Sequence, residues 1–81
     1  MPIVNRIAPD EQHVQAIIFA KGKWTEAQSR DWLREHDYYT DGYDESESYH
    51  RWRQYDPNSD KFSYRTKEID EGLKLIIGFV E

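Results

Sequence analysis

Cysteine is absent from the 81-residue sequence, and so are long apolar runs. The missing cysteines exclude disulfide bonds, thiolate zinc sites and cysteine nucleophiles, and they fit a reducing compartment. No segment has the length and apolar character of a membrane span, and no apolar run follows the first residues as it would in a signal peptide. We therefore expect a protein of the cytoplasm that has no contact with a membrane.

The residues that are present are typical of a folded chain. Hydrophobic residues make up 37% of the sequence and aromatic residues 15%, which is too many for a disordered chain, while the 33% of charged residues supply a polar surface. A chain of this size forms one domain with a modest core, which disfavours a multi-step enzyme with a deep cleft. We expect an N-terminal arm at residues 1–12, with Ile3, Val4 and Ile7 as docking residues, and a single domain at residues 13–81.

Residue patterns predict four strands. Apolar runs predict strands at residues 14–20 and 73–80, and these two strands should be neighbours in the sheet. Charged residues alternate with aromatic or polar ones at residues 49–54 and 62–67, as in strands with two different faces. Residues 38–48 have neither period, so we expect an acidic, tyrosine-bearing loop there.

One helix is predicted between the first two strands. Thr25 and Gln28 have the spacing of a capping box, so the helix should begin there and end at Glu35 or His36. Gly78 inside the last strand indicates a bulge or a close packing contact beneath this helix. The buried stripe should consist of Ala27, Trp32, Leu33 and His36, with Ser29, Arg30, Asp31 and Arg34 facing water. The predicted fold is an α+β two-layer sandwich of order β-α-β-β-β, with one helix on a four-stranded, mostly antiparallel sheet.

Basic side chains recur at alternate positions of the strands predicted at 49–54 and 62–67. We interpret these strands as one hairpin connected through Asp56-Pro57-Asn58-Ser59. One face of the hairpin would carry Arg51, Arg53, Arg65 and Lys67, and the other Trp52, Phe62 and Tyr64. Guanidinium groups recognise carboxylates and phosphates in a planar, bidentate way. We therefore predict that an anionic ligand or acidic partner surface binds to Arg51, Arg53, Arg65, Lys67, Gln54 and Tyr43.

The same cations have an alternative, structural interpretation. Residues 37–48 contain five acidic residues and no Lys or Arg, whereas residues 49–67 contain five Lys or Arg and two Asp. The acidic stretch could fold over the basic strands, or the arginines could form an internal lattice with Glu68, Asp70 and Glu71. The sequence leaves the binding and the structural interpretations open.

A series of residues between Ile17 and Gly78 matches a known pattern. The series comprises Lys23-Trp24-Thr25, Ala27, Trp32-Leu33, His36, Asp44-Glu45, Arg51-Trp52-Arg53-Gln54, Arg65-Thr66, Gly72 and Ile76-Ile77-Gly78. The segment resembles a short domain that recurs in tailed-phage and some giant-virus proteins, alone or fused near prohead-protease or XkdF-like head-gene products. That family tends to have a glycine where this chain has Asp37 after the helix. The resemblance implies a viral origin and this class of fold, but it implies no reaction.

Neither catalysis nor metal binding is predicted. His13, His36 and His50 lie apart in the sequence, and no nucleophile and base accompany them in a recognisable spacing. We interpret His36 as a helix-end residue that contacts the terminal carbonyls, and His50 as a structural residue among aromatic side chains. The carboxylates of residues 37–47 do not have the spacing of a calcium loop. We predict no catalytic residue, no metal and no cofactor.

The charge distribution favours a protein or a compact anion as the binding partner. The net charge of −5 argues against broad, non-specific binding of nucleic acid. Arginines and exposed tyrosines are enriched in protein interfaces. We predict a non-catalytic viral accessory binding module that acts in the cytoplasm of an infected host cell. The alternatives are an interaction module in phage head assembly, an anti-defence inhibitor that sequesters a nucleotide messenger and, last, a small enzyme.

Overall fold

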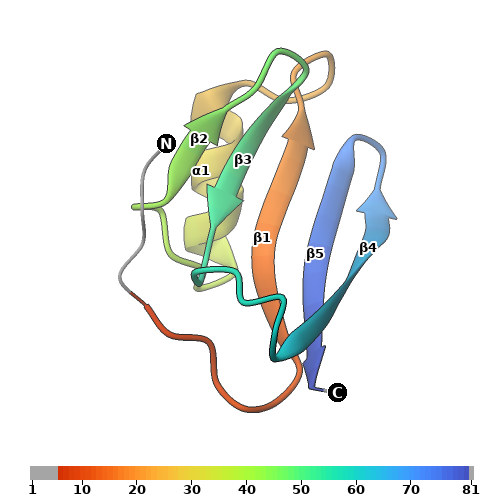
Figure 1. Cartoon of the computed structure of the whole chain (residues 1–81). Helices are drawn as coiled ribbons and strands as arrows, with labels where there is room; N and C mark the ends of the chain where they lie inside the picture. Colours follow the sequence, from red (N-terminus) through yellow and green to blue (C-terminus); the bar gives the residue numbers. More distant parts are fainter. Residues whose placement is uncertain (1–5, 81) are drawn as a thin grey trace.

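A computed structural model gives the fold of residues 6–80, in which one helix packs on a five-stranded antiparallel sheet (Figure 1). The elements are β1 (His13–Ala20), α1 (Glu26–Glu35), β2 (Tyr43–Glu45), β3 (Tyr49–Arg53), β4 (Phe62–Asp70) and β5 (Leu73–Val80). The strands lie in the order β2-β3-β1-β5-β4. The α+β class with one helix on the sheet is confirmed, and this part of the chain has one strand more than expected.

The additional strand, β2, lies within the stretch predicted as an acidic loop. It pairs with the outer edge of β3, where Asp44 is opposite Arg51 and Tyr43 is opposite Trp52. The Tyr43 and Trp52 rings lie 4.5 Å apart between centroids, which anchors the strand to the core. Three residues, of which two are acidic, give no strand signal of their own.

The two apolar strands, β1 and β5, lie side by side at the centre of the sheet, as predicted. Ile17 of β1 is opposite Trp52 of β3 on one side and Leu75 of β5 on the other. Ile17, Trp52, Phe19 and Leu33 are fully buried. The main core therefore lies between α1 and the part of the sheet formed by β3, β1 and the start of β5.

Both ends of α1 are fixed by local hydrogen bonds. Thr25 Oγ1 accepts a hydrogen bond from the Gln28 amide at 3.1 Å, and Gln28 Oε1 accepts one from the Thr25 amide at 2.9 Å, so the predicted capping box is confirmed. After the helix, Asp37 has a φ of 60°, and the Tyr38 amide donates to the Leu33 carbonyl at 2.9 Å. This is the stop that usually contains glycine, here made with an aspartate.

The buried side of α1 differs from the predicted stripe. Ala27 and His36 are exposed, whereas Ser29 is fully buried beside Leu33. Ser29 Oγ donates to the Glu26 carbonyl at 2.7 Å and accepts a hydrogen bond from Trp52 Nε1 at 3.0 Å. A buried indole N–H needs an acceptor, and this need explains why a hydroxyl faces the core here.

Strands β3 and β4 do not form the predicted hairpin. β3 pairs with β1 and β2, and β4 pairs only with β5, so two strands separate the proposed partners. Residues 54–61 connect them across one end of the sheet (Figure 1). The strongly apolar β1 is the central strand and has β5 beside it, so β3 lies on the other side of β1 and β4 lies at the edge beyond β5. A tight turn at residues 70–73 joins β4 to β5 in a hairpin.

Among residues 6–12, the described part of the N-terminal arm, one residue is buried. Ala8 is 8% exposed, whereas Ile7 is 93% exposed, so Ile7 does not dock as expected. Ile3 and Val4, the other expected docking residues, lie outside the described residues.

Gly78 makes the close packing contact that the sequence suggested, but not beneath α1. It pairs with His13 of β1 and with Tyr64 of β4. A Cβ atom at Gly78 would lie only 2.7 Å from His13 Cε1 and 3.0 Å from a Tyr64 ring carbon. The His13 ring is in turn edge-on to Phe62 and Tyr55, with centroid distances of 4.8 Å and 5.4 Å. These rings form a second, smaller packing cluster.

Candidate binding surface

Cross-strand pairing places Arg51 and Arg53 on the face of the sheet opposite α1. Residues directly opposite each other in an antiparallel pair share a face. Arg51 is opposite Ile18, and Ile18 is also opposite Lys74, whereas the neighbouring Ile17 belongs to the core under α1. Because successive side chains alternate between the two faces, Arg51, Arg53 and Lys74 project away from the helix.

Arg65 and Lys67 project from the other face. Lys67 is opposite Leu75, which packs against the core, and Arg65 is opposite Ile77. The Arg65 guanidinium lies 5.5 Å from the centroid of the Phe79 ring on the same side. The prediction that the four cations share one face is therefore wrong. The prediction depended on a β3–β4 hairpin. In the observed pairing, the cations of β3 project from one face of the sheet and those of β4 from the other.

The helix-free face combines cations with apolar side chains. Arg51 and Lys74 lie on either side of Ile18 in one cross-strand row, and Arg53, Ala16 and Ile76 form the next. A dent of about 90 Å³ opens beside Ile18, lined also by Ala20, Tyr49, Gly72 and Lys74. We define the Arg51 surface as Arg51, Arg53, Lys74, Ile18, Ala16 and Ile76.

Arg51 is half-buried and lacks an ion pair with any of residues 6–80. Its Nε atom is buried and has no hydrogen-bond partner in the same part of the chain. Asp44 lies opposite on β2 but forms no ion pair with it. Desolvation of a guanidinium is unfavourable unless a partner compensates for it, so Arg51 is the least satisfied cation of this face.

The acidic stretch pairs with other cations. Asp41 receives two hydrogen bonds from the Arg6 guanidinium, at 2.6 Å and 2.9 Å, and these hold the pKa of the Asp41 carboxyl below its ordinary value. Glu45 pairs with Lys21 at 2.6 Å, and this contact likewise lowers the pKa of Glu45. The stretch therefore anchors the arm and the β1–α1 connection and does not neutralise Arg51.

Gln54 and Tyr43, the two uncharged residues of the predicted site, have internal partners. The buried Gln54 amide accepts from the Tyr39 amide at 2.8 Å and donates to the Tyr39 carbonyl at 3.0 Å. The Tyr43 hydroxyl lies 2.9 Å from Nδ1 of His50. Burial raises the pKa of Tyr43, so its phenol stays protonated and donates to this nitrogen. Gln54 holds the segment after α1, Tyr43 holds β2 to β3, and both lie outside the Arg51 surface.

Each histidine donates to a backbone carbonyl. The pairs are His13 Nδ1 with Glu11, His36 Nδ1 with Trp32 and His50 Nε2 with Trp24, at 2.9, 2.8 and 3.1 Å. The interpretation of His36 as a helix-end residue bonded to a carbonyl is confirmed, and its ring also stacks on the Trp32 indole. Within residues 6–80, no group of three or more His, Asp or Glu side chains is placed to hold a metal ion.

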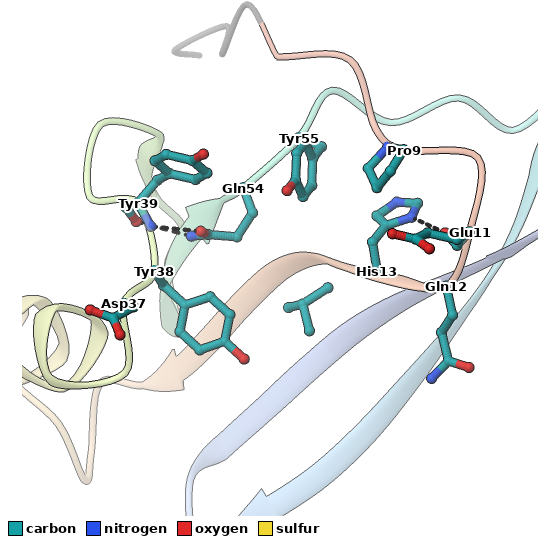
Figure 2. Close-up of a pocket in the computed structure, with 10 residues that line it drawn as sticks. Pro9, Glu11, Gln12, His13, Asp37, Tyr38, Tyr39, Gln54 and Tyr55 are labelled. Atoms are coloured by element: carbon teal, nitrogen blue, oxygen red, sulfur yellow. Dashed lines mark hydrogen bonds between the residues drawn. The ribbon is translucent and has the colours of Figure 1, made fainter.

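A hollow of about 420 Å³ lies apart from the Arg51 surface, at the start of β1 (Figure 2). Its walls come from the arm, from β1 and from the segments that follow α1 and β3, so no local sequence pattern could reveal it. The charged residues that line it are Glu11 and Asp37, both acidic, so the hollow does not suit an anion. The remaining lining residues are Pro9, Gln12, His13, Val14, Tyr38, Tyr39, Gln54 and Tyr55.

Comparisons of the chain with protein-family models, with curated proteins and with solved structures find no match. In the part of the chain that the structure describes, no helix has the length and apolar character needed to cross a membrane. The functional argument therefore depends on the side-chain geometry.

Proposed function

We propose that this chain is a non-catalytic binding module whose Arg51 surface engages an acidic segment of a protein partner. The observation that carries the proposal is the half-buried Arg51, which has no ion pair within residues 6–80. A partner carboxylate would compensate this guanidinium through two parallel N–H···O bonds. The contact is worth more at a desolvated position than on an open surface.

The apolar residues of the surface favour a protein over a free phosphate. Ile18 lies between Arg51 and Lys74, and the dent of about 90 Å³ beside it is lined largely by apolar side chains. A partner with an apolar side chain next to a carboxylate would fill the dent and pair with a cation together. Interfaces combine an apolar centre with arginines in this way.

The viral setting of this proposal comes from the resemblance of the sequence alone. A phage or giant-virus accessory role would place the module in the cytoplasm of the infected host. An interaction module in head assembly fits an acidic protein partner, whereas an anti-defence inhibitor that sequesters a nucleotide messenger would require this surface to bind a phosphorylated anion.

The proposal can be tested by titrating isotope-labelled protein with a short peptide of alternating glutamate and leucine. Inorganic pyrophosphate and a lysine-for-glutamate peptide serve as comparison probes. We expect amide shift changes around Ile18, Arg51 and Lys74 with the acidic peptide. Arg51→Ala should weaken binding about tenfold or more, Arg51→Lys should recover part of the loss, and added salt should weaken the wild-type complex.

Arg34→Ala is the matched control, because Arg34 is an exposed arginine of α1 on the other side of the sheet. It should leave peptide binding unchanged. Shifts confined to other surfaces, or an Arg51→Ala variant that loses stability but keeps its affinity, would refute the proposal. Stronger shifts with pyrophosphate would show that the surface takes phosphorylated anions instead.

A further inference from the structure

The helix covers only one half of its face of the sheet (Figure 1). Ser29 and Arg30 of α1 lie over Trp52 of β3, with a 3.0 Å hydrogen bond and a guanidinium 5.3 Å from the indole. On the same face, β5 carries three half-buried apolar side chains, Leu75, Ile77 and Phe79. Leu75 packs against the core under α1, whereas Ile77 and Phe79 lie outside that core.

The flank of α1 forms a step beside this half of the sheet (Figure 1), and we call this step the groove. Trp24 and Trp32 are half-buried on the helix side, and Trp24 Nε1 donates to the carbonyl of Glu71, in the β4–β5 turn. The flank is hollowed by about 440 Å³. The lining residues are Lys23, Trp24, Gln28, Asp31, Trp32 and Glu35.

The two walls of the groove have opposite charge. Asp31 and Glu35 are exposed on the α1 flank, and Arg65 and Lys67 are exposed on β4. None of these four side chains makes an ion pair with another residue of the described chain. A binding partner in the groove must therefore place acidic side chains against β4, basic side chains against α1 and an apolar surface between them.

We propose that a second copy of this chain fills the groove, in a dimer with two-fold symmetry. The α1 flank of each copy lies against β5 and β4 of the other, so that Asp31 and Glu35 of one copy meet Arg65 and Lys67 of its partner. In such a two-fold contact, the two walls of each groove bind the two walls of the other groove. The assembly therefore stops at two copies. It also covers the exposed edges of Trp24 and Trp32.

The charges of β4 disfavour the alternative dimer, in which two β4 edges pair. Two-fold antiparallel pairing places residues of the same face opposite each other. When Thr66 of one copy is opposite Thr66 of the other, Arg65 of each copy is opposite Lys67 of the other. If the two-fold axis moves by one residue, Arg65 is opposite Arg65 of the other copy, or Lys67 is opposite Lys67. Like charges at these positions protect an edge strand from self-pairing. The face of the β4–β5 hairpin is therefore the surface left for a second copy.

A charge exchange tests this dimer by sedimentation equilibrium of the whole chain. We expect the wild type to dimerise, and both R65E/K67E and D31K/E35K to dissociate at least about tenfold more readily, because like charges then face each other. An equimolar mixture of the two variants should form a heterodimer, since each groove again has opposite walls. E11K/E47K, which alters two exposed acids outside the groove, should dimerise like the wild type.

Folding of each variant is checked by circular dichroism, and rescue in the mixture also requires that both are folded. Tryptophan emission gives a second readout, because Trp24 and Trp32 should shift to shorter wavelength as the wild-type concentration rises, whereas Trp52 is already buried. A wild type that stays monomeric at millimolar concentration would overturn the proposal. So would a dimer that tolerates both double substitutions, or a mixture that remains monomeric.

Discussion

Replacing Gly78 with alanine adds one methyl group where the His13 and Tyr64 rings lie close to the backbone of β5. The new Cβ would lie 2.7 Å from His13 Cε1 and 2.8 Å from Nε2. Carbon atoms normally approach to about 3.5–4.0 Å, so the ring must retreat by roughly 1 Å. His13 cannot do this easily, because Phe62 and Tyr55 contact its faces and edges and Nδ1 donates to the Glu11 carbonyl.

The expected loss follows from two opposing effects. Overpacking in a filled region costs about 1–3 kcal/mol, whereas Gly→Ala reduces the freedom of the unfolded chain and returns about 0.4–1 kcal/mol. We therefore expect Gly78→Ala to lower the free energy of unfolding by about 0.5–2 kcal/mol. Gly22→Ala is the matched control, since a Cβ there meets nothing within 4 Å, and it should be neutral or slightly stabilising.

Urea unfolding followed by tryptophan fluorescence measures both variants, with an unchanged slope as the sign that unfolding exposes the same amount of surface. The cause of the loss is tested by adding His13→Ala, which removes the ring. The double variant should be at least about 1 kcal/mol more stable than the sum of the two single effects. A fully stable Gly78→Ala protein, or strict additivity with His13→Ala, would refute the steric explanation.

Two further substitutions test local features of the chain. Asp37→Gly should raise the free energy of unfolding by roughly 0.5–1 kcal/mol in urea melts, because the residue has a φ of 60°, where glycine is unstrained. Asp41→Asn should lower stability by less than about 1 kcal/mol at neutral pH, because it removes an exposed pair with Arg6. The Arg6 contact lowers the pKa of folded Asp41, so its contribution is complete above the ordinary carboxyl pKa of about 4 and is lost as the pH falls through the lower, folded value.

Each of these substitutions has a control. Glu35→Gly places the same glycine at the last residue of α1 and should cost up to about 1 kcal/mol, so a gain there as well would remove the conformational explanation for Asp37. Glu47→Gln neutralises an exposed acid that forms no ion pair with the described residues. If the wild type and Asp41→Asn differ in free energy of unfolding by the same amount at pH 2 as at neutral pH, the carboxylate charge is not the source of the difference.

The features predicted correctly from the sequence are those encoded within a few neighbouring residues. The capping box of Thr25 and Gln28 needs only a four-residue segment, and the apolar runs of β1 and β5 reveal burial on both faces. The prediction that Ser29 faces water was wrong because the Ser29 hydroxyl accepts the indole hydrogen bond of Trp52, which lies 23 residues away. No pattern along the helix contains that information.

The binding face was misread because alternation orders residues only within one strand. It shows correctly that Arg51 is opposite in direction to Trp52, and that Arg65 is opposite to Tyr64. Whether Arg51 and Arg65 share a face depends on the strands between them, and a change of one residue in register reverses the answer. The sequence contains strong signals for each strand but only weak ones for its partners.

The separation of the cations onto two faces makes the two proposed interactions independent. In these proposals, Arg51 and Lys74 on the helix-free face are the contacts for the acidic partner, and Arg65 and Lys67 on the other face are the contacts for the second copy. Arg51→Ala should therefore weaken the acidic peptide complex and leave sedimentation unchanged, while R65E/K67E should do the reverse. A single basic patch, as the hairpin would have formed, predicts that each change affects both measurements. Dimerisation would then place two Arg51 surfaces on the outside of one particle, so that a partner with two acidic segments binds more tightly than one with a single segment.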